Sequence, residues 1–164
     1  LDSLRRGYII NKTPPSFEYL LVLFAAQELN VKKIVKMNKL IIDAAKEKIF
    51  LMVIINNDIY NISHENSKTN YEKLVILIQD FINSKGIKIH DISMLYVNRG
   101  PGSFAGIRNS LSIIKAIHLV KKIDFYCYSL RDFNDDHEIK YENIPNLCNK
   151  FKVKKNLIKP IYIS

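Results

Sequence analysis

The sequence predicts a mixed α/β domain with the element order β-β-β-α-β-α-β. Two observations carry this prediction. After Met37, three short apolar runs follow one another with only turn residues between them, and beyond them helical patterns alternate with short apolar runs. Strands joined by tight turns pair antiparallel, whereas strands joined through a helix pair in parallel. We therefore expect one sheet that contains both kinds of pairing.

The three runs are expected to be strands at 39–45 (KLIIDAA), 49–55 (IFLMVII) and 58–63. The first two are almost entirely apolar, and Asn56 and Asn57 supply a turn between the second and the third. This pattern predicts an antiparallel meander.

A helix is expected at 69–85. Thr69 and Glu72 have the spacing of a capping box, and Gly86 is placed to end the helix in the left-handed region. Ile76 and Leu77 either meet a partner or make a second contact with the core. The stripe expected to cover the sheet consists of Tyr71, Leu74, Val75, Ile78, Phe81 and Ile82.

A strand at 94–97 leads into a glycine-rich loop and a second helix at 107–121, and a last strand is expected at 125–128. A helix with two apolar faces is typical of one held between its own sheet and a neighbour. The second helix has two such faces, one with Leu111, Ile114 and His118 and the other with Ile113, Ala116, Ile117 and Val120. The whole order fits the ribonuclease-H-like subdomain of the actin-like ATPase superfamily.

The two ends of the chain lie outside this pattern. Residues 1–36 open on Leu1, as a processed product, a fragment or an open reading frame would, and contain one predicted helix at 16–29. This helix follows Pro14 and Pro15 and is apolar nearly all round, so it needs to be buried. Residues 131–164 are expected to form a short, polar and basic tail without regular structure, apart from 161–163.

Composition excludes several classes of protein. The chain is 48% hydrophobic and 25% charged, as globular proteins are, and no apolar run approaches the roughly 20 residues that cross a bilayer. Cys127 and Cys148 are too few for a disulfide framework or a four-cysteine metal site. The net charge of +9 attracts phosphate, but 26 Ile, 20 Lys and 16 Asn are a bias that AT-rich codon usage also produces. We expect a cytoplasmic protein without a membrane partner.

The glycine loop matches neither common nucleotide motif. Gly106 is followed by Ile107 and Arg108 where a Walker A loop needs Lys and Ser or Thr, and the glycine spacing is G-x-G-x-x-x-G instead of G-x-G-x-x-G. Arg108 faces the positive end of the helix dipole, so we expect it to be compensated by a negative group, from its own fold or from outside. Phe104 is either a core residue under the loop, the favoured interpretation, or an exposed aromatic for a partner.

Residues 97–117, VNRGPGSFAGIRNSLSIIKAI, resemble the signature of the bacterial TsaB (YeaZ) family, in which a G-P-G-S-F-T-G-[LVI]-R run follows a strand. The run KLIIDAA resembles the opening strand of that family, His64 and Glu65 its His-Ser-Glu, and 126–130 the strand before its later Ser-Leu. The similarity covers 37–130, and 160–163 resemble the Pro-x-Tyr-Leu ending. The motif positions are Arg99, Gly100, Pro101, Gly102, Ser103, Phe104, Gly106 and Arg108.

The resemblance implies a non-catalytic subunit of the machinery that makes N6-threonylcarbamoyladenosine in tRNA. Such subunits pair with the related TsaD, which holds the metal and transfers the threonylcarbamoyl group, and the ATPase TsaE joins the pair. The pairing is a four-helix bundle, which here assigns the partner interface to Ile76, Leu77, Leu111, Ile113, Ala116, Ile117 and Val120. The resemblance implies no cofactor on this chain alone, leaves ATP open at the complex interface, and leaves self-association open when the partner is absent.

The sequence also departs from the family. Ala44 and Ala45 replace Thr-Ser after Asp43, Ala105 replaces the loop Thr, and only 34 residues follow Leu130 where the family has a second subdomain. Two alternatives therefore stay open: a small ATPase or kinase that uses the glycine loop, with Asp43 where actin-like ATPases keep a metal-linked carboxylate, and a degenerate, inactive paralogue. The basic tail either contacts tRNA directly or is only solvated; its lysines are Lys150, Lys152, Lys154, Lys155 and Lys159.

No other pattern predicts catalysis. Ser103 does not sit in a G-x-S-x-G motif, and the acidic cluster at 135–138 is typical of a solvated turn. Cys127 is expected to be a small core residue. We expect no metal site and no catalytic residue, since metal-ligand spacing is absent among His64, His90, His118 and His137.

Overall fold

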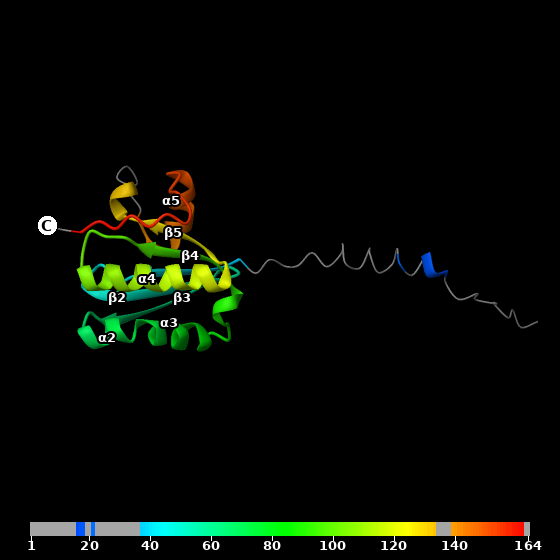
Figure 1. The fold of residues 1–164 in the computed structure, drawn as a ribbon, viewed down its shortest axis with the longest axis horizontal. Coiled ribbons are helices and arrows are strands. Elements are labelled where there is room, and N and C mark those ends of the chain that lie inside the picture. Colours follow the sequence, from blue (N-terminus) through cyan, green and yellow to red (C-terminus); the bar gives the residue numbers. More distant parts are fainter. Residues whose placement is uncertain (1–15, 19–20, 22–36, 134–138, 163–164) are drawn as a thin grey trace, which may run out of the picture. The chain divides into compact units, whose positions relative to one another are not determined.

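The computed structural model describes residues 16–18, 21, 37–133 and 139–162 (Figure 1). The chain divides into two units, residues 1–35 and 36–164. Of the helix expected at 16–29, Phe17, Glu18 and Leu21 are helical. The rest of that helix and the acidic cluster at 135–138 lie outside the described residues. In the ranges that are described, no helix is both long and apolar enough to cross a bilayer.

The second unit is built on a five-stranded mixed sheet with the order β3-β2-β1-β4-β5. Strands β1 (Asn38–Asp43), β2 (Lys48–Ile55) and β3 (Asp58–Glu65) form the expected antiparallel meander. Strands β4 (Ile92–Asn98) and β5 (Asp124–Tyr128) extend it in parallel on the other side of β1. The predicted element order is confirmed.

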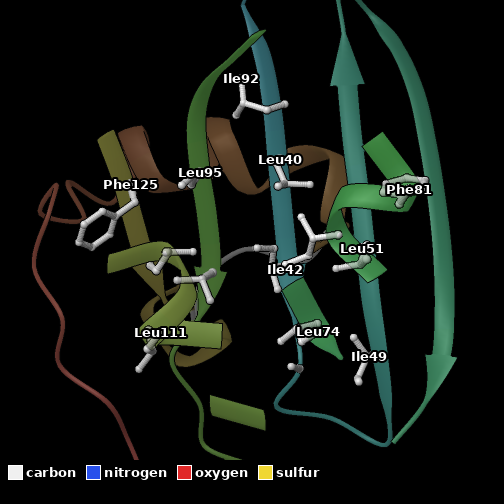
Figure 2. Close-up of a cluster of buried hydrophobic side chains, with 14 of the residues drawn as sticks. Leu40, Ile42, Ile49, Leu51, Leu74, Phe81, Ile92, Leu95, Leu111 and Phe125 are labelled. Carbon is white, nitrogen blue, oxygen red and sulfur yellow. The ribbon is translucent and has the colours of Figure 1, made fainter. Parts of the chain in front are cut away.

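Helices α2 (Lys68–Glu72), α3 (Leu74–Asn83) and α4 (Phe104–Lys121) cover one face of the sheet. Figure 2 shows the core beneath them, where Leu74 and Phe81 from the helices lie over Leu51 of β2, and Leu111 lies on the same side as Leu95 and Phe125. Gly86 has φ of 72°, so the predicted left-handed end of the first helical region is confirmed.

The first helical region differs from the prediction in three ways. The helix is interrupted at Lys73, between α2 and α3. The cap is Ser67, whose side chain accepts a hydrogen bond from the backbone N–H of Asn70 at 3.2 Å, so the prediction of a cap at Thr69 is wrong. Val75 is 54% exposed and does not belong to the buried stripe. The break rotates the residues after Lys73 relative to the stripe that one continuous helix would present.

The opposite face of the sheet is covered by the C-terminal part of the chain. Helix α5 (Ile144–Lys150) packs there with 3-10 turns at Leu130–Phe133 and Tyr141–Asn143. The expectation of a polar, irregular tail is therefore wrong for this stretch, since five of its described residues are buried: Phe133, Ile144, Pro145, Leu147 and Cys148.

After α5 the chain runs beside β5 and returns to the glycine loop (Figure 1). The N–H of Asn156 donates to the carbonyl of Phe125 at 2.8 Å, and the N–H of Ile161 donates to the carbonyl of Arg99 at 2.8 Å. The guanidinium of Arg99 also binds Asp132 at 2.7 Å and the carbonyl of Lys159 at 3.1 Å. Residues 153–162, the C-terminal segment, are thus fastened to the outer edge of β5.

Candidate functional site

The glycine loop lies between β4 and α4, where parallel strands end and a helix begins. Ser103 is the N-cap of α4, and its hydroxyl accepts a hydrogen bond from the N–H of Gly106 at 3.3 Å. The N–H of Ser103 donates to the carbonyl of Ala45 at 2.8 Å. The hydroxyl of Tyr71 also donates to Ser103 Oγ at 2.9 Å, which ties α2 to the loop.

The three loop glycines make room for the backbone of the same chain. A side chain on Gly100 would meet the carbonyl oxygen of Ile161, one on Gly102 that of Ala45, and one on Gly106 that of Ala44. Carbonyl oxygens carry partial negative charge and repel phosphate, whereas a phosphate cradle presents N–H groups. The loop therefore packs closely against backbone atoms of its own chain, and this close packing explains its glycines without a bound nucleotide.

Asp43 does not fit the role of a metal-linked carboxylate. Its side chain is fully buried, and one oxygen accepts from the N–H of Ala45 at 3.0 Å. The other oxygen accepts from the amide of Asn98 at 3.0 Å and from the hydroxyl of Tyr141 at 2.7 Å. The carboxylate thus accepts three hydrogen bonds from its own chain and has a structural role. The residues present therefore do not fit a metal-bound nucleotide.

Tyr141 closes this end of the sheet. Its ring stacks on Phe50 with 4.0 Å between centroids, and the ammonium of Lys46 lies 5.3 Å from its centroid. Burial, followed by the charge of Asp43 and the hydrogen bond to it, raises the pKa of Tyr141 well above its ordinary value of 10.0. The hydroxyl therefore stays protonated and remains a donor.

A cleft of about 720 Å³ lies outside this contact, lined in part by Lys46, Lys48, Ser63 and Ser103.

The other candidate site is a groove of about 670 Å³ between α3 and α4. On α4 it is lined by Ser112, Ile113, Ala116 and Ile117. On α3 and the turn that follows, it is lined by Val75, Ile78, Gln79, Ile82, Asn83, Lys88, Ile89 and His90. Two further apolar side chains of the same helices are exposed without lining the groove: Ile76 of α3 at 55% and Val120 of α4 at 73%. We call the groove with these two residues the helix face.

Of the seven predicted interface residues, Ile113, Ala116 and Ile117 line the groove, and Ile76 and Val120 are exposed on α3 and α4; their role in an interface stays a prediction. Leu111 is 5% exposed and packs in the core under α4, so its assignment to the interface is wrong. Leu77 is half-buried against the core and does not line the groove.

Two motif residues also differ from expectation. Phe104 is 57% exposed and rests on Tyr162, with 4.9 Å between ring centroids, so the core interpretation is wrong. Helix α4 begins at Phe104, so Arg108 is its fifth residue, beyond the first turn, and the predicted conflict with the helix dipole is wrong. Arg108 is exposed, and no described acidic residue forms an ion pair with it. Cys127 is buried, as predicted.

Sequence reasoning missed the end of the groove formed by Lys88, Ile89 and His90, and it missed Tyr141. The groove end is a 3-10 turn at Ile89–Asp91, which is too short to give a periodic pattern. Tyr141 reaches Asp43 across 98 positions of sequence, and no local spacing reports such a contact.

The comparisons with known proteins agree with this fold. The family model of TsaD, tRNA N6-adenosine threonylcarbamoyltransferase, matches residues 54–129. The solved structure of YeaZ from Pseudomonas aeruginosa superposes with a TM-score of 0.53 at 14% identity, over 60% of this chain and 49% of that one. The chain has the YeaZ fold. A second structure, an uncharacterized protein with similarity to peptidase YeaZ from Pseudomonas aeruginosa, gives the same values. No curated protein matches the sequence.

The YeaZ likeness establishes the actin-like, ribonuclease-H-like fold of the domain. The chain spans about half the length of the YeaZ structures that it matches. The TsaD match starts within β2 and ends after β5, so it includes both helices of the helix face and the glycine loop. The chain has the fold of YeaZ, and residues 54–129 match the family model of TsaD.

Proposed function

We propose that this chain is a non-catalytic subunit that supports N6-threonylcarbamoyladenosine modification of tRNA by docking on a TsaD-like transferase through the helix face. One observation carries the proposal: an apolar groove between α3 and α4 is left open, with Val120 and Ile76 more than half exposed beside it. Contiguous apolar surface of this kind marks a site of protein interaction. The likeness to YeaZ and TsaD supplies the tRNA-modification context.

The proposal assigns the chemistry to the partner. Among the described residues no group of three or more His, Cys, Asp or Glu is placed to hold a metal ion. Asp43 and the glycine loop are occupied by contacts within the chain. In this proposal the chain alone holds no cofactor, and ATP binds at the interface of a complex that includes a TsaE-like ATPase. The complex binds tRNA and is cytoplasmic.

The test is co-expression with the TsaD-like protein of the same organism, followed by size-exclusion chromatography. We expect a stoichiometric complex and faster tRNA modification than with the TsaD-like protein alone. Val120→Asp should abolish co-elution, because it places a charge in the apolar contact while leaving the core of this chain intact. Leu157→Asp is the matched control, since Leu157 is 48% exposed on the C-terminal segment.

Separate elution of the wild-type proteins at micromolar concentration, together with modification that proceeds equally well without this chain, would rule out the proposal. A saturable heat on titrating the isolated chain with millimolar Mg-ATP would instead favour the ATPase alternative. The lysines of the C-terminal region are a separate matter, because Lys155 already pairs with Asp124 at 3.4 Å. A direct contact of this region with tRNA is a secondary part of the proposal.

A further inference from the structure

Strand β3 lies at an edge of the sheet that the described part of the chain leaves unpaired. It is the outermost strand in the order β3-β2-β1-β4-β5, and no strand or bridge of the described ranges pairs with its outer side (Figure 2). Seven of its eight residues are exposed. The opposite edge differs, because the C-terminal segment covers β5 through Asn156 and through a bridge between Tyr126 and Lys155. The described sheet therefore has one open edge.

Strand β3 lacks the features that keep an edge strand from pairing with another chain. Such features are Lys side chains, proline and β-bulges on the edge. The run from Asp58 to Glu65 contains no Lys, Arg or Pro, and its register with β2 continues from one end to the other without a bulge. Three of its large side chains are exposed instead: Ile59 at 44%, Tyr60 at 37% and Ile62 at 38%. An edge of this length and composition is a template for a further strand.

The hairpin determines which backbone groups of β3 face outward. Ile55 and Asp58 close a two-residue turn, and such a turn closes on a hydrogen-bonded pair. Pairs alternate along an antiparallel ladder, so every second residue counted from Asp58 directs its N–H and C=O groups toward β2. The backbone groups of Ile59, Asn61 and Ser63 therefore point away from the sheet, toward whatever approaches the edge.

A second copy of β3 fits this edge in the antiparallel orientation. Outward-facing residues of the two strands must lie opposite one another, which allows the pairing to be centred on Asn61 or on Ile62. Centred on Asn61, the pairing sets Asp58 of each copy opposite His64 of the other. An acidic side chain opposite a histidine is a favourable cross-strand pair, and the two-fold symmetry forms it twice.

The pairing centred on Asn61 also matches the apolar side chains of β3. It sets Tyr60 of each copy opposite Ile62 of the other, and an aromatic ring opposite a β-branched side chain stabilises a sheet. The pairing centred on Ile62 would instead set the carboxylate of Glu65 opposite the apolar side chain of Ile59. The strand is therefore complementary to itself about Asn61.

We propose that two copies of this chain associate through β3, which pairs antiparallel with β3 of the second copy about a two-fold axis at Asn61 and joins the two five-stranded sheets into one. Association stops at a dimer, because the C-terminal segment covers the other edge of each sheet. No residue of β3 lines the groove between α3 and α4. The dimer therefore uses a different surface from the helix face, and its test is independent of the proposed function.

Disulfide capture in the full chain tests the register. In the proposed dimer the two copies of residue 61 form a hydrogen-bonded pair with Cα atoms about 5.5 Å apart, within the range of about 4.4–6.8 Å that a disulfide spans. Asn61→Cys should therefore cross-link into a dimer under mild oxidation. Ile62→Cys is the matched control, because its two copies would lie about 8 Å apart, beyond that range. Cys127 and Cys148 are buried, so the wild-type chain should not cross-link.

Sedimentation equilibrium of the full chain measures reversible association, in about 150 mM NaCl to screen the net charge of +9. We expect the wild-type chain to shift from monomer to dimer as its concentration rises. Asn61→Pro should stay monomeric, because the N–H at this position faces outward and its removal costs the second copy a donor but costs β2 none. Asn61→Thr keeps the donor and should dimerise as the wild-type chain does. Thermal unfolding of both variants at low concentration checks that the fold is retained.

Three results would overturn the inference. A dimer that persists in Asn61→Pro would place self-association on another surface. Cross-linking of Ile62→Cys without that of Asn61→Cys would show that the strands do not pair about Asn61. A wild-type chain that stays monomeric while the amides of Ile59, Asn61 and Ser63 resist hydrogen exchange would show that the chain covers this edge itself. Co-elution with the TsaD-like protein should be unchanged in all β3 variants, so failure of the dimer leaves the proposed function standing.

Discussion

At the scale of single residues, the glycine loop shows how a ligand-like motif is used for packing. Gly106 has no room for a side chain because the carbonyl of Ala44 and the ring of Tyr71 approach it. The carboxylate of Asp43 likewise accepts hydrogen bonds from three donors of its own chain. The residues that resemble a nucleotide site therefore fasten β1, the loop and the C-terminal segment to one another.

Gly106→Ala tests this packing role. The added methyl group would meet backbone atoms of Ala44, which cannot rotate away, so the free energy of unfolding should fall by about 3 kcal/mol. Gly86→Asn is the control, because a side chain there meets nothing within 4 Å and Asn tolerates its φ of 72°. Urea denaturation measures both. Equal losses in the two variants would contradict the role of Gly106 as a close contact.

Tyr141→Phe tests the network around Asp43. The variant keeps the stacking on Phe50 but removes one donor from a buried carboxylate, so the free energy of unfolding should fall by about 1.5–3 kcal/mol. Tyr162→Phe should change stability by less than about 0.5 kcal/mol, because Tyr162 is 45% exposed. Thermal unfolding followed by circular dichroism measures both. A neutral Tyr141→Phe would mean that the hydroxyl contributes nothing to holding the C-terminal region.

At the scale of elements, the sequence predicts what periodicity controls. The order of strands and helices and the left-handed end at Gly86 follow from local patterns, and all are confirmed. Helix α5 has seven residues, too few for a reliable apolar period, and is stabilised by burying Ile144 and Leu147 against a sheet formed earlier in the chain. Local propensity is a weak guide where tertiary burial decides the conformation.

The candidate site, like the elements, could be predicted only where local periodicity controls the structure. Two apolar faces on α4 could be recognised from spacing, but which of them faces the sheet depends on where the glycine loop starts the helix. Helix α4 begins at Phe104, which turns Leu111 inward and leaves Val120 outward. The assignment of Leu111 to the interface therefore failed on orientation, whereas Ile113, Ala116 and Ile117 line the open groove and their assignment to an interface stays a prediction.

Leu111→Ala and Val120→Ala separate these two faces. Leu111→Ala should lower the free energy of unfolding by about 2–5 kcal/mol, because it leaves a cavity in the core beneath α4. Val120→Ala should change it by less than about 0.5 kcal/mol, since Val120 is 73% exposed. Chemical denaturation of the isolated chain measures both. The opposite ranking would show that α4 packs on the sheet through its other side.

At the scale of the whole molecule, the C-terminal region completes a domain that covers only half of the YeaZ structures it matches. Phe133 and α5 bury one face of the sheet, and the C-terminal segment then covers the edge of β5. An unpaired edge strand invites association with other chains, so this covering protects that side. The stability of the domain therefore depends on this region.

Alkaline pH should destabilise the domain, and the thiols set the onset. Burial raises the pKa of Cys127 from 9.0 to about 12, and burial followed by the charge of Asp132 raises that of Cys148 from 9.0 to about 12. Between about pH 9 and pH 12, the two thiols lose their protons in the unfolded chain but keep them in the folded chain. The free energy of unfolding is therefore undiminished below about pH 9 and falls above it, by up to about 1.4 kcal/mol per pH unit for each thiol.

The raised pKa values of the buried tyrosines Tyr96, Tyr128 and Tyr141 add to the loss above pH 10, because each must stay neutral in the fold while it ionises in the unfolded chain. Urea denaturation at pH 7, 8, 9.5 and 10.5 in the presence of a phosphine reductant measures the slope. Cys148→Ala should show a shallower decline above pH 9 than wild type, whatever its stability at pH 7, because one of the two thiols no longer titrates. A stability that stays level from pH 8 to 10.5 would mean that these groups are solvated in the folded protein and that α5 does not seal the sheet face on which it packs.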